Sequence, residues 1–439
     1  MISKNQTYEF FATCGRGLEG LLASELKALQ NSRVRPLQNG VAFFGTLDQG
    51  LRACLWLRTA SRVLLILDRV PARDGDELYR NLSKIPWEDH ISASGNFAID
   101  AFGTNKNLRN SQFLAMRAKD ALVDRIRRKH GKRPDVQKQR PDVLVNVRLR
   151  GDKATIALDL SGEPLHRRGY RTQSPLIRAP LKENIAAAML LSAGWNTPRI
   201  PHTPRIPHTS CILHTSRHPA LDAGSLHSKQ SCASASAIST NSFLLDPFCG
   251  SGTIAIEAAM IASDRAPGLL RDYWGFNGWL GLDEVTWNRL LDEADDRADQ
   301  GSTILSESTP IILANDNNPK VLQVAVESAK RADLAKHIEF TASDIAKLKR
   351  PEHLKEGSGK TGTLATNPPY AQRLATEDQL SILYKGLATT IKEFNIQTAA
   401  LITPDNEVES YIDAVIGEEP SKRIPTMNGP IEADIRIWL

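Results

Sequence analysis

The sequence has few cysteines and no long hydrophobic run, and each absence excludes a class of protein. Five cysteines, odd in number and scattered over 439 residues, are typical of free thiols in a reducing compartment rather than of a disulfide framework. No apolar run approaches the ~20 residues that a membrane helix needs, and residues 1–11 show no export signal. We therefore expect a cytoplasmic protein without a membrane partner.

Positive charge is in small excess overall but is concentrated in one stretch. The net charge is +5, whereas residues 101–182 alone contain 20 Lys and Arg against 7 Asp and Glu. Such asymmetry predicts a polyanionic partner for this stretch. The alternative is a solvated helix face with loosely held counterions.

The length predicts two or three domains, each with its own core. Residues 1–70 contain the pattern strand, helix, strand, strand, helix, strand, with an Asn39-Gly40 turn between the two middle strands. This order predicts a ferredoxin-like α+β module. Residues 71–178 form a second unit, with an expected strand at 97–102, a long helix at 111–130 and a hairpin within 143–160.

Basic side chains lie on and next to this long helix, and a second group surrounds Tyr170. An aromatic ring among cations suits phosphate contact beside base stacking. We expect ten of them to contact nucleic acid: Arg109, Arg117, Arg125, Arg128, Lys129, Lys132, Arg133, Arg167, Arg168 and Arg171.

Residues 196–241 interrupt the pattern with a tandem Thr-Pro-Arg-Ile-Pro-His repeat and a Ser, Ala and His-rich tail. Such a composition cannot build a packed core, so we interpret the segment as a disordered insertion. Five residues at close spacing could instead ligate zinc: His202, His208, Cys211, His214 and His218. Without a Cys-x-x-Cys pair we expect no metal site.

The remaining residues, 179–439, alternate strands and helices as an α/β domain does. A buried strand at 243–245 leads into the Gly-rich sequence 246–253, and a helix follows at 254–262. Glycines let the backbone approach a ligand closely, and free amides at the helix start favour a carboxylate or a phosphate. The leading Asp246 suits a ligand that carries an ammonium group.

Two later strands of this domain also end in acidic residues. Asp316 follows the strand at 311–314 and could accept hydrogen bonds from ribose hydroxyls, whereas Asp344 follows the strand at 338–341 and could meet an adenine amino group. Each aspartate alone could simply cap a helix. Three acidic strand ends in succession favour an adenosine-type ligand with an amino-acid tail. The expected contacts are Asp246, Pro247, Cys249, Gly250, Gly252, Thr253, Asp316, Asp344 and Ile345.

A stiff turn follows the fourth strand of the domain, at 362–366. It consists of Asn367, Pro368, Pro369 and Tyr370, the expected catalytic residues. An exocyclic amine on a planar ring is a poor nucleophile because its lone pair is delocalised. The Asn367 side-chain oxygen and the Pro368 carbonyl could accept both amine hydrogens and orient the nitrogen toward a methyl donor, while Tyr370 stacks on the ring.

The two motifs together resemble class I S-adenosylmethionine (SAM)-dependent amino-methyltransferases. With the upstream ferredoxin-like and THUMP-like halves, the chain resembles the RlmL group of bacterial 23S rRNA guanine-N2 methyltransferases over nearly its whole length outside 196–241. The resemblance implies a Rossmann-like, mostly parallel seven-stranded sheet, with an antiparallel edge hairpin at 424–439. It also implies SAM as cofactor and 23S rRNA, or its precursor, as substrate.

The resemblance further implies that residues 178–188 pack across the cofactor. The sequence departs from the group at 371–374, where Ala-Gln-Arg-Leu stands in place of Gly-Glu-Arg-Leu, which puts any role for an acid at 372 in doubt. Some relatives carry a second methyltransferase domain that makes N7-methylguanine. Because the sequence ends at Leu439 without one, we expect a single activity.

The choice of guanine rests on the resemblance alone, since nothing in the turn at 367–370 selects it. One alternative is an amino-methyltransferase of the same class that acts on tRNA guanine, adenine, cytosine or a protein glutamine. Another is a non-catalytic rRNA-binding assembly factor. Binding of SAM, or its absence, separates the enzymes from the assembly factor.

Overall fold

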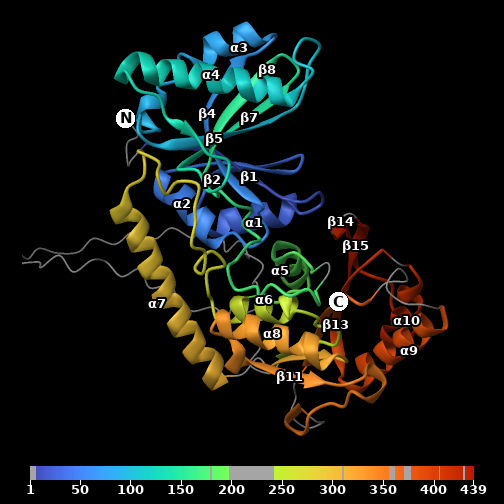
Figure 1. Ribbon diagram of the computed structural model, residues 1–439. Helices are drawn as coiled ribbons and strands as arrows, with labels where there is room; N and C mark the ends of the chain where they lie inside the picture. Colours follow the sequence, from blue (N-terminus) through green and yellow to red (C-terminus); the bar gives the residue numbers. More distant parts are fainter. Residues whose placement is uncertain are drawn as a thin grey trace, which may run out of the picture.

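The computed structural model describes residues 6–177, 180–196, 242–308, 311–354, 361–369, 377–404, 406–428 and 431–439. Within them the chain forms an eight-stranded sheet from its N-terminal part and a seven-stranded sheet from its C-terminal part. The two sheets lie one above the other in Figure 1, and the long helix α7 (Glu284–Ser308) runs along one side of their junction.

The first half of the N-terminal sheet has the predicted ferredoxin-like order. Its elements are β1 (Tyr8–Thr13), α1 (Glu19–Ala28), β2 (Ser32–Leu37), β3 (Gly40–Gly45), α2 (Leu47–Trp56) and β4 (Arg62–Pro71). The strands lie in the order β2-β3-β1-β4 and are antiparallel. Asn39, at the turn between β2 and β3, has a φ of +61°, a conformation that an Asn-Gly turn requires.

The second half adds the strands of the predicted THUMP unit to the same sheet. Its elements are α3 (Gly75–Leu82), η1 (Trp87–Asp89), β5 (Asn96–Phe102), α4 (Ser111–His130), β6 (Asp135–Val136), β7 (Val143–Arg150) and β8 (Lys153–Asp159). The ten-residue β4 pairs with β1 through residues 62–65 and with β8 through residues 64–71. One sheet therefore runs through both N-terminal modules, a continuity that no local sequence pattern predicts.

The C-terminal domain has the predicted α/β fold. Its elements are α5 (Glu183–Ser192), β9 (Ser242–Asp246), α6 (Thr253–Ala262), α7, β10 (Ile311–Asp316), α8 (Pro319–Arg331), η2 (Ala335–His337), β11 (Ile338–Ala342), η3 (Ile345–Lys347), η4 (Glu352–Leu354), β12 (Thr361–Thr366), α9 (Glu377–Glu393), β13 (Ile396–Thr403), α10 (Glu407–Ile416), β14 (Lys422–Asn428) and β15 (Ile431–Trp438).

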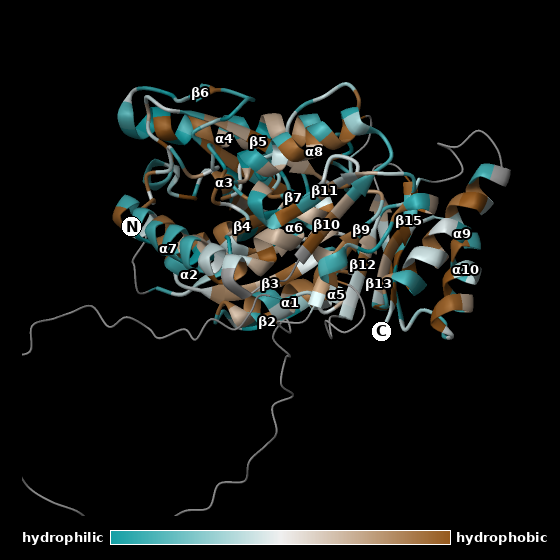
Figure 2. Cartoon of the chain, turned by 90° about the horizontal axis from the view of Figure 1, so that it is seen from below, coloured by the Kyte–Doolittle hydropathy of each residue, from teal (hydrophilic) through white to brown (hydrophobic). Residues whose placement is uncertain are grey.

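The C-terminal sheet has the strand order β11-β10-β9-β12-β13-β15-β14. The first five strands are parallel, whereas β15 and β14 form an antiparallel edge hairpin. Both faces are buried, since Leu244 and Ile312 pack in one core with α6 while Phe243 and Leu313 pack in another with α9. Hydrophobic residues accordingly mark the central strands and α6 in Figure 2. The carboxyl ends of the five parallel strands meet at one edge, where the two motifs lie.

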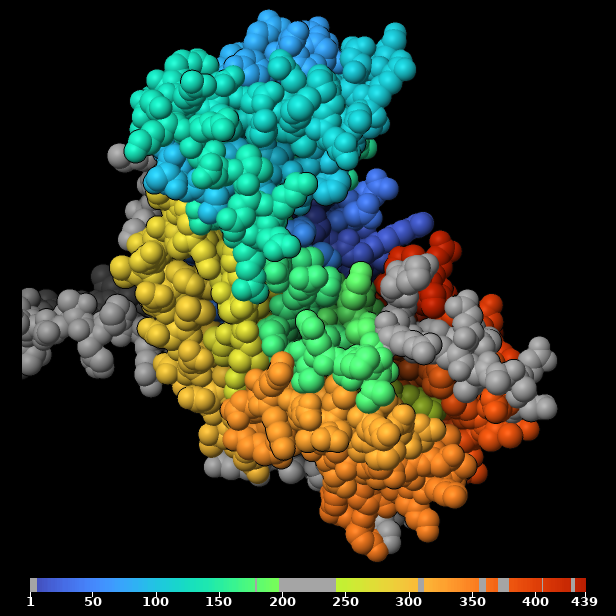
Figure 3. Space-filling view, in the orientation of Figure 1, coloured from blue at the N-terminus to red at the C-terminus, as the bar shows by residue number. Residues whose placement is uncertain are grey.

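Buried polar contacts join the ferredoxin-like module to the C-terminal domain. Arg58 is 6% exposed and donates to the carbonyls of Met260 and Arg265 at 3.3 and 2.9 Å. The guanidinium of Arg297, on α7, lies 3.7 Å from the centre of the Trp56 ring on α2. In Figure 3 the green segment around residues 160–190 lies between the blue N-terminal strands and the orange part of the C-terminal domain. The two sheets are therefore held together by buried contacts rather than by a free linker.

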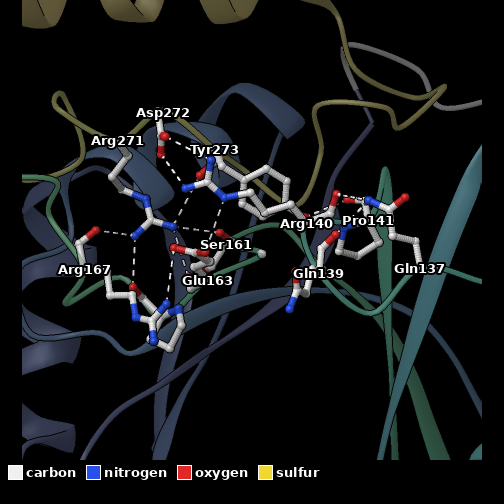
Figure 4. A network of polar contacts seen from close by, with 12 residues as sticks. Gln137, Gln139, Arg140, Pro141, Ser161, Glu163, Arg167, Arg271, Asp272 and Tyr273 are labelled. Atoms are coloured by element: carbon white, nitrogen blue, oxygen red, sulfur yellow. Dashed lines mark hydrogen bonds and ion pairs between the residues drawn. The ribbon is translucent and has the colours of Figure 1, made fainter.

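The loop between α6 and α7 binds the THUMP unit through a dense polar network, shown in Figure 4. The terminal nitrogens of Arg271 donate to the backbone carbonyls of five residues: Ser161, Glu163, Pro164, Arg167 and Tyr273. The Tyr273 hydroxyl donates to the Pro141 carbonyl at 2.6 Å. Because Arg271 donates to backbone carbonyls rather than to side chains, it fixes the path of residues 161–167 against the C-terminal domain.

Three further features of the described residues concern membrane helices, disulfides and metal ligands, which the sequence argues against. No helix in the described ranges is both long and apolar enough to cross a membrane. Cys14, Cys54 and Cys249 are buried free thiols. The described residues contain no cluster of three metal-ligating side chains, whereas residues 197–241, with the candidate zinc ligands, lie outside them.

Candidate active site

A buried hydrogen bond joins the Gly-rich loop to the strand that carries the Asn-Pro-Pro turn. Asp246, at the end of β9, and Thr366, at the end of β12, are both 0% exposed. The Thr366 hydroxyl donates to Asp246 Oδ1 at 2.7 Å, and the Phe248 amide donates to the same oxygen at 3.4 Å. Because β9 and β12 are neighbours in the sheet, the bond fixes the two sequence motifs side by side.

The second carboxylate oxygen of Asp246 has no hydrogen-bond donor among the described residues, although it is buried. The pKa of Asp246 is raised to about 7, because burial and, to a smaller extent, the charge of Asp316 outweigh the hydrogen bonds from Thr366 and Phe248, which lower it. A buried acceptor without a donor is costly unless a ligand supplies one. The chemistry of this oxygen fits a cationic donor such as an ammonium group.

The loop after Asp246 is shaped by two glycines with positive φ. Gly250 has a φ of +54° and Gly252 a φ of +78°, which other residues rarely adopt. A Cβ on Gly252 would lie 2.9 Å from the Cβ of Ala325 on α8, so α8 leaves no room for a side chain there. Gly252 is also the N-cap residue of α6. Because it has no side chain to accept hydrogen bonds from the first amides of that helix, these amides stay open toward the loop.

Asp316 lies against the Gly-rich loop, at the end of β10. Its carboxylate accepts hydrogen bonds from the amides of Gly250, at 3.0 Å, and Asn318, at 2.9 Å. Its neighbour Asn315 is 2% exposed and donates to the carbonyls of Pro247 and Ser343 at 3.1 and 2.9 Å. Asn315 thus joins three strand ends. Asn315 is not among the site residues predicted from the sequence. Its position next to Asp316 marks it as a candidate, but the sequence does not show which of two adjacent polar side chains at a strand end points into the protein.

Asp344 is exposed and caps the short helix η3 by accepting from the Ala346 amide at 2.8 Å. The capping role that the sequence left open is therefore present, and it leaves the other carboxylate oxygen available. Ile345 is half-buried and packs against the core of α9. A contact between either residue and adenine stays a prediction.

The Asn-Pro-Pro turn begins directly after β12, at the carboxyl edge of the sheet. Pro368 is buried, whereas Asn367 and Pro369 are half-buried. Tyr370 and residues 371–374 lie outside the described residues, as do Arg178 and Ala179 of the expected cofactor-covering segment. The described part of that segment begins α5, where Glu183 pairs with Arg171 at 2.8 Å and Arg171 also reaches the Thr253 hydroxyl at 3.4 Å.

The ten basic residues expected to contact RNA fall into three groups. Six are exposed: Arg109, Arg128, Lys129, Lys132, Arg133 and Arg167. Arg117, Arg125 and Arg171 are half-buried and pair with Asp76, Glu88 and Glu183. Arg168 is 1% exposed, and its guanidinium donates to the carbonyls of Leu165 and Arg58 at 2.7 and 2.6 Å.

Arg168 therefore has no surface to offer RNA, and the same holds for the aromatic ring beside it. Tyr170 is 1% exposed and its hydroxyl donates to Glu257 on α6 at 3.1 Å. The expected stacking of a base on Tyr170 does not fit this burial. Both residues instead tie the segment before α5 to the C-terminal core.

Three family models match the chain in succession. They are the RlmL ferredoxin-like domain at residues 9–64, the THUMP domain at residues 72–159 and the RMKL-like methyltransferase domain at residues 224–437. The chain has the domain set of the RlmL type. Its methyltransferase domain contains both sequence motifs and the whole seven-stranded sheet. The domain limits at 70 and 178 stay predictions, and β4 pairs with strands on both sides of the first limit.

Curated relatives of this chain are named ribosomal RNA large subunit methyltransferase K/L. The protein from Syntrophotalea carbinolica is 38% identical over 97% of this chain and 52% of its own length. That from Magnetococcus marinus is 39% identical over 87% of this chain and 46% of its own length. The chain thus spans about half the length of these RlmL-type relatives, and the expected single activity stays a prediction.

A solved structure shares the overall fold of this chain. The protein SMU.472, whose crystal structure is a complex with SAH, matches 99% of this chain and 98% of its own with a TM-score of 0.75 at 24% identity. At that identity the likeness supports the fold alone. It covers both sheets and the junction between them.

Proposed function

We propose that this chain transfers a methyl group from SAM to the exocyclic amine of a base in large-subunit ribosomal RNA, and that the product is N2-methylguanine in 23S rRNA. One observation carries the proposal: the Thr366–Asp246 hydrogen bond places the Asn-Pro-Pro turn beside a Gly-rich loop with an unsatisfied buried carboxylate oxygen. A ligand-binding loop and an amine-accepting turn thus share one edge of the sheet. The RMKL-like methyltransferase match covers both motifs.

The residues of the Gly-rich loop fit SAM. The unsatisfied oxygen of Asp246 suits the ammonium group of a methionine tail, and the positive φ of Gly250 and Gly252 lets the backbone approach it. Asp316 would hold ribose hydroxyls and Asp344 the adenine amine. When bound, SAM supplies an electrophilic methyl group on a sulfonium centre.

The turn would position the target amine and hold its hydrogens. The Asn367 side-chain oxygen and the Pro368 carbonyl are the proposed acceptors, and Tyr370 the proposed stacking partner. Pro368 has no amide hydrogen and a fixed φ, so the turn is preorganised. Catalysis by orientation and fixed dipoles needs no strong base.

RNA as the substrate class is supported by the THUMP match and by the six exposed cations, which lie just before, on and after α4 and at residue 167. Exposed cations set affinity through phosphate contacts and do not read sequence. A target base within structured RNA would have to be flipped out to reach the turn. The proposed surface therefore excludes Arg168, which is buried.

The test is methyl transfer from labelled SAM to deproteinised 23S rRNA that lacks its native modifications, followed by nucleoside digestion and mass analysis. Label in N2-methylguanosine is the expected result. Label in another methylated nucleoside would retain the mechanism and reject the base. Label in no RNA, together with SAM-dependent thermal stabilisation, would point to a protein amine, and no stabilisation at all would leave an RNA-binding assembly factor.

A further inference from the structure

A cleft of about 700 Å³ opens between the ferredoxin-like module and the last two strands of the chain. We call it the junction cleft. Its polar lining includes Arg16, Ser61, His166, Lys182, Asn184 and Thr426. In Figure 3 the blue N-terminal strands and the red C-terminal hairpin approach each other above the green segment that carries residue 166.

The junction cleft lies at the edge of the C-terminal sheet that also carries the Asn-Pro-Pro turn. Pro404, which follows β13, and Asp434, which pairs with the last residue of β13, both line it. Strand β13 is the neighbour of β12, with Thr366 opposite Leu401. The first residue of the turn, Asn367, is therefore one strand away from the cleft wall.

The wall formed by the ferredoxin-like module lies close to the β14–β15 hairpin at the loop before α1. A Cβ on Gly17 would lie 3.0 Å from both the Ile424 side chain and the Pro425 carbonyl on β14. Gly17 has a φ of +85°, so this loop is built for close approach. The two walls, although about 400 residues apart in sequence, form one surface.

The wall formed by residues 164–185 contributes one cation to the lining, Lys182, beside a neutral His166. The pKa of His166 is lowered to about 3, first by burial and then by the charges of Lys182, Arg168 and Arg167. Lys182 and Arg16 are exposed. The acidic groups on the facing hairpin are Glu432 and Asp434, and the latter lies 3.8 Å from Arg436.

The N-terminus of α5 opens into the same cleft. Lys182 is its N-cap, and no described side chain caps this ten-residue helix, so its first amides and its dipole favour an anion. Asn184, in the first turn, is 3% exposed and donates to the Ser61 hydroxyl at 3.4 Å. Its Oδ1 has no donor among the described residues. The cleft therefore offers an anion site and, beside it, a buried acceptor.

We infer that the junction cleft holds the ribose-phosphate backbone of the RNA strand next to the target nucleotide. A phosphate lies at the N-terminus of α5 between Arg16 and Lys182, and a ribose 2′-hydroxyl donates to Asn184 Oδ1. A ribonucleotide carries both groups at the required proximity, whereas DNA lacks the donor. This inference rests on the proposed function, since it names how the substrate of the same site is held.

The test compares equilibrium binding of a short single-stranded RNA over a range of salt concentrations. The double variant Arg16→Ala/Lys182→Ala should bind on the order of tenfold more weakly at low salt, with a salt slope reduced by about 1–2. The matched control is Lys336→Ala, an exposed lysine in η2 at the opposite edge of the sheet, which should change neither quantity. Equal slopes for the double variant and the wild type would overturn the inference.

Asn184 gives a second, independent comparison. The wild type should bind the RNA more tightly than DNA of the same sequence, and Asn184→Ala should reduce this preference by about threefold to tenfold, the value of one hydrogen bond. An unchanged preference in a variant with a wild-type melting temperature would contradict the role of Asn184. A loss of SAM binding without loss of RNA binding would assign the cleft to the cofactor and also overturn the inference.

Because these readouts are binding constants, they do not depend on turnover. If the wild type methylates no RNA, the proposed function fails, and the slope comparison still decides whether the cleft holds RNA. If the wild type methylates RNA but the variants bind it normally, only the cleft assignment fails.

Discussion

Two polar networks in this molecule differ in what their side chains bind. At the junction in Figure 4, the terminal nitrogens of Arg271 donate to five carbonyls, and its guanidinium lies 4.6 Å from the centre of the Trp274 ring. At the carboxyl edge of the C-terminal sheet, Asp246 keeps a buried oxygen without a donor. The Arg271 guanidinium has a buried Nε without a partner as well, but its terminal nitrogens are bonded to backbone within the protein and so hold the architecture. The buried oxygen of Asp246 is instead an acceptor that a ligand could pair.

The largest expected effect is on turnover. Asn367→Ala should lower kcat for methyl transfer by about 10³-fold, since one preorganised acceptor of the amine is lost. The Kd for SAM, measured by calorimetry, should stay within about twofold, because Asn367 is not among the residues proposed to hold the cofactor. Turnover near the wild-type rate would show that the proposed amine clamp is wrong.

The next effect is on stability. Arg271→Ala should lower the free energy of unfolding by about 3 kcal/mol, because five backbone carbonyls, four of them in part-buried contacts, lose a charged donor. The matched control is Arg140→Ala, since Arg140 is half exposed and pairs with the exposed Asp272, and this loss should cost less than about 1 kcal/mol. Denaturant unfolding measures both. Similar costs for the two variants would remove the distinction between a junction bonded to backbone and a surface ion pair.

A smaller effect concerns pH and Asp246. Its pKa in the folded chain is raised to about 7, so the folded state binds a proton that the unfolded state releases near pH 4. The stability from this proton is fully present below pH 4 and is lost as pH rises through about 7. Asp246→Asn, which cannot ionise, should therefore lose less stability than the wild type between pH 5 and pH 8 in thermal unfolding without SAM. Parallel stability curves would refute this.

The smallest effect separates exposed from buried cations. Arg128→Ala should reduce the salt slope of RNA binding by about 1 and leave the melting temperature unchanged. Arg168→Met should do the reverse, because Arg168 donates to buried carbonyls and lies 3.5 Å from Glu257. A lower salt slope for a folded Arg168→Met would restore it to the RNA surface.

Much of the fold could be predicted from local sequence patterns. The Asn39-Gly40 turn, the long helix at 111–130 and the alternating strands of the α/β domain are confirmed. The continuity of β4 with β8 and the packing of α7 on α2 could not be predicted. They depend on contacts between residues far apart in sequence, which periodicity does not encode.

The candidate site divides in the same way. The Gly-rich loop and the Asn-Pro-Pro turn were recognisable because their backbone chemistry is local. The Thr366–Asp246 bond and the Asn315 link join separate strands, so no single motif contains them. Arg168 and Tyr170 are buried and do not lie on the expected surface. Charge density reports the number of cations but not the direction in which each side chain points.

The most direct test of the central claim is the proton balance of SAM binding, measured by calorimetry at pH 7 in buffers of different ionisation enthalpy. An ammonium ligand at Asp246 should lower the pKa of its carboxyl, so binding should release a fraction of a proton per SAM, and Asp246→Asn should abolish that release. Binding without proton release, or equal release by the variant, would contradict the assignment of the unsatisfied oxygen to the cofactor.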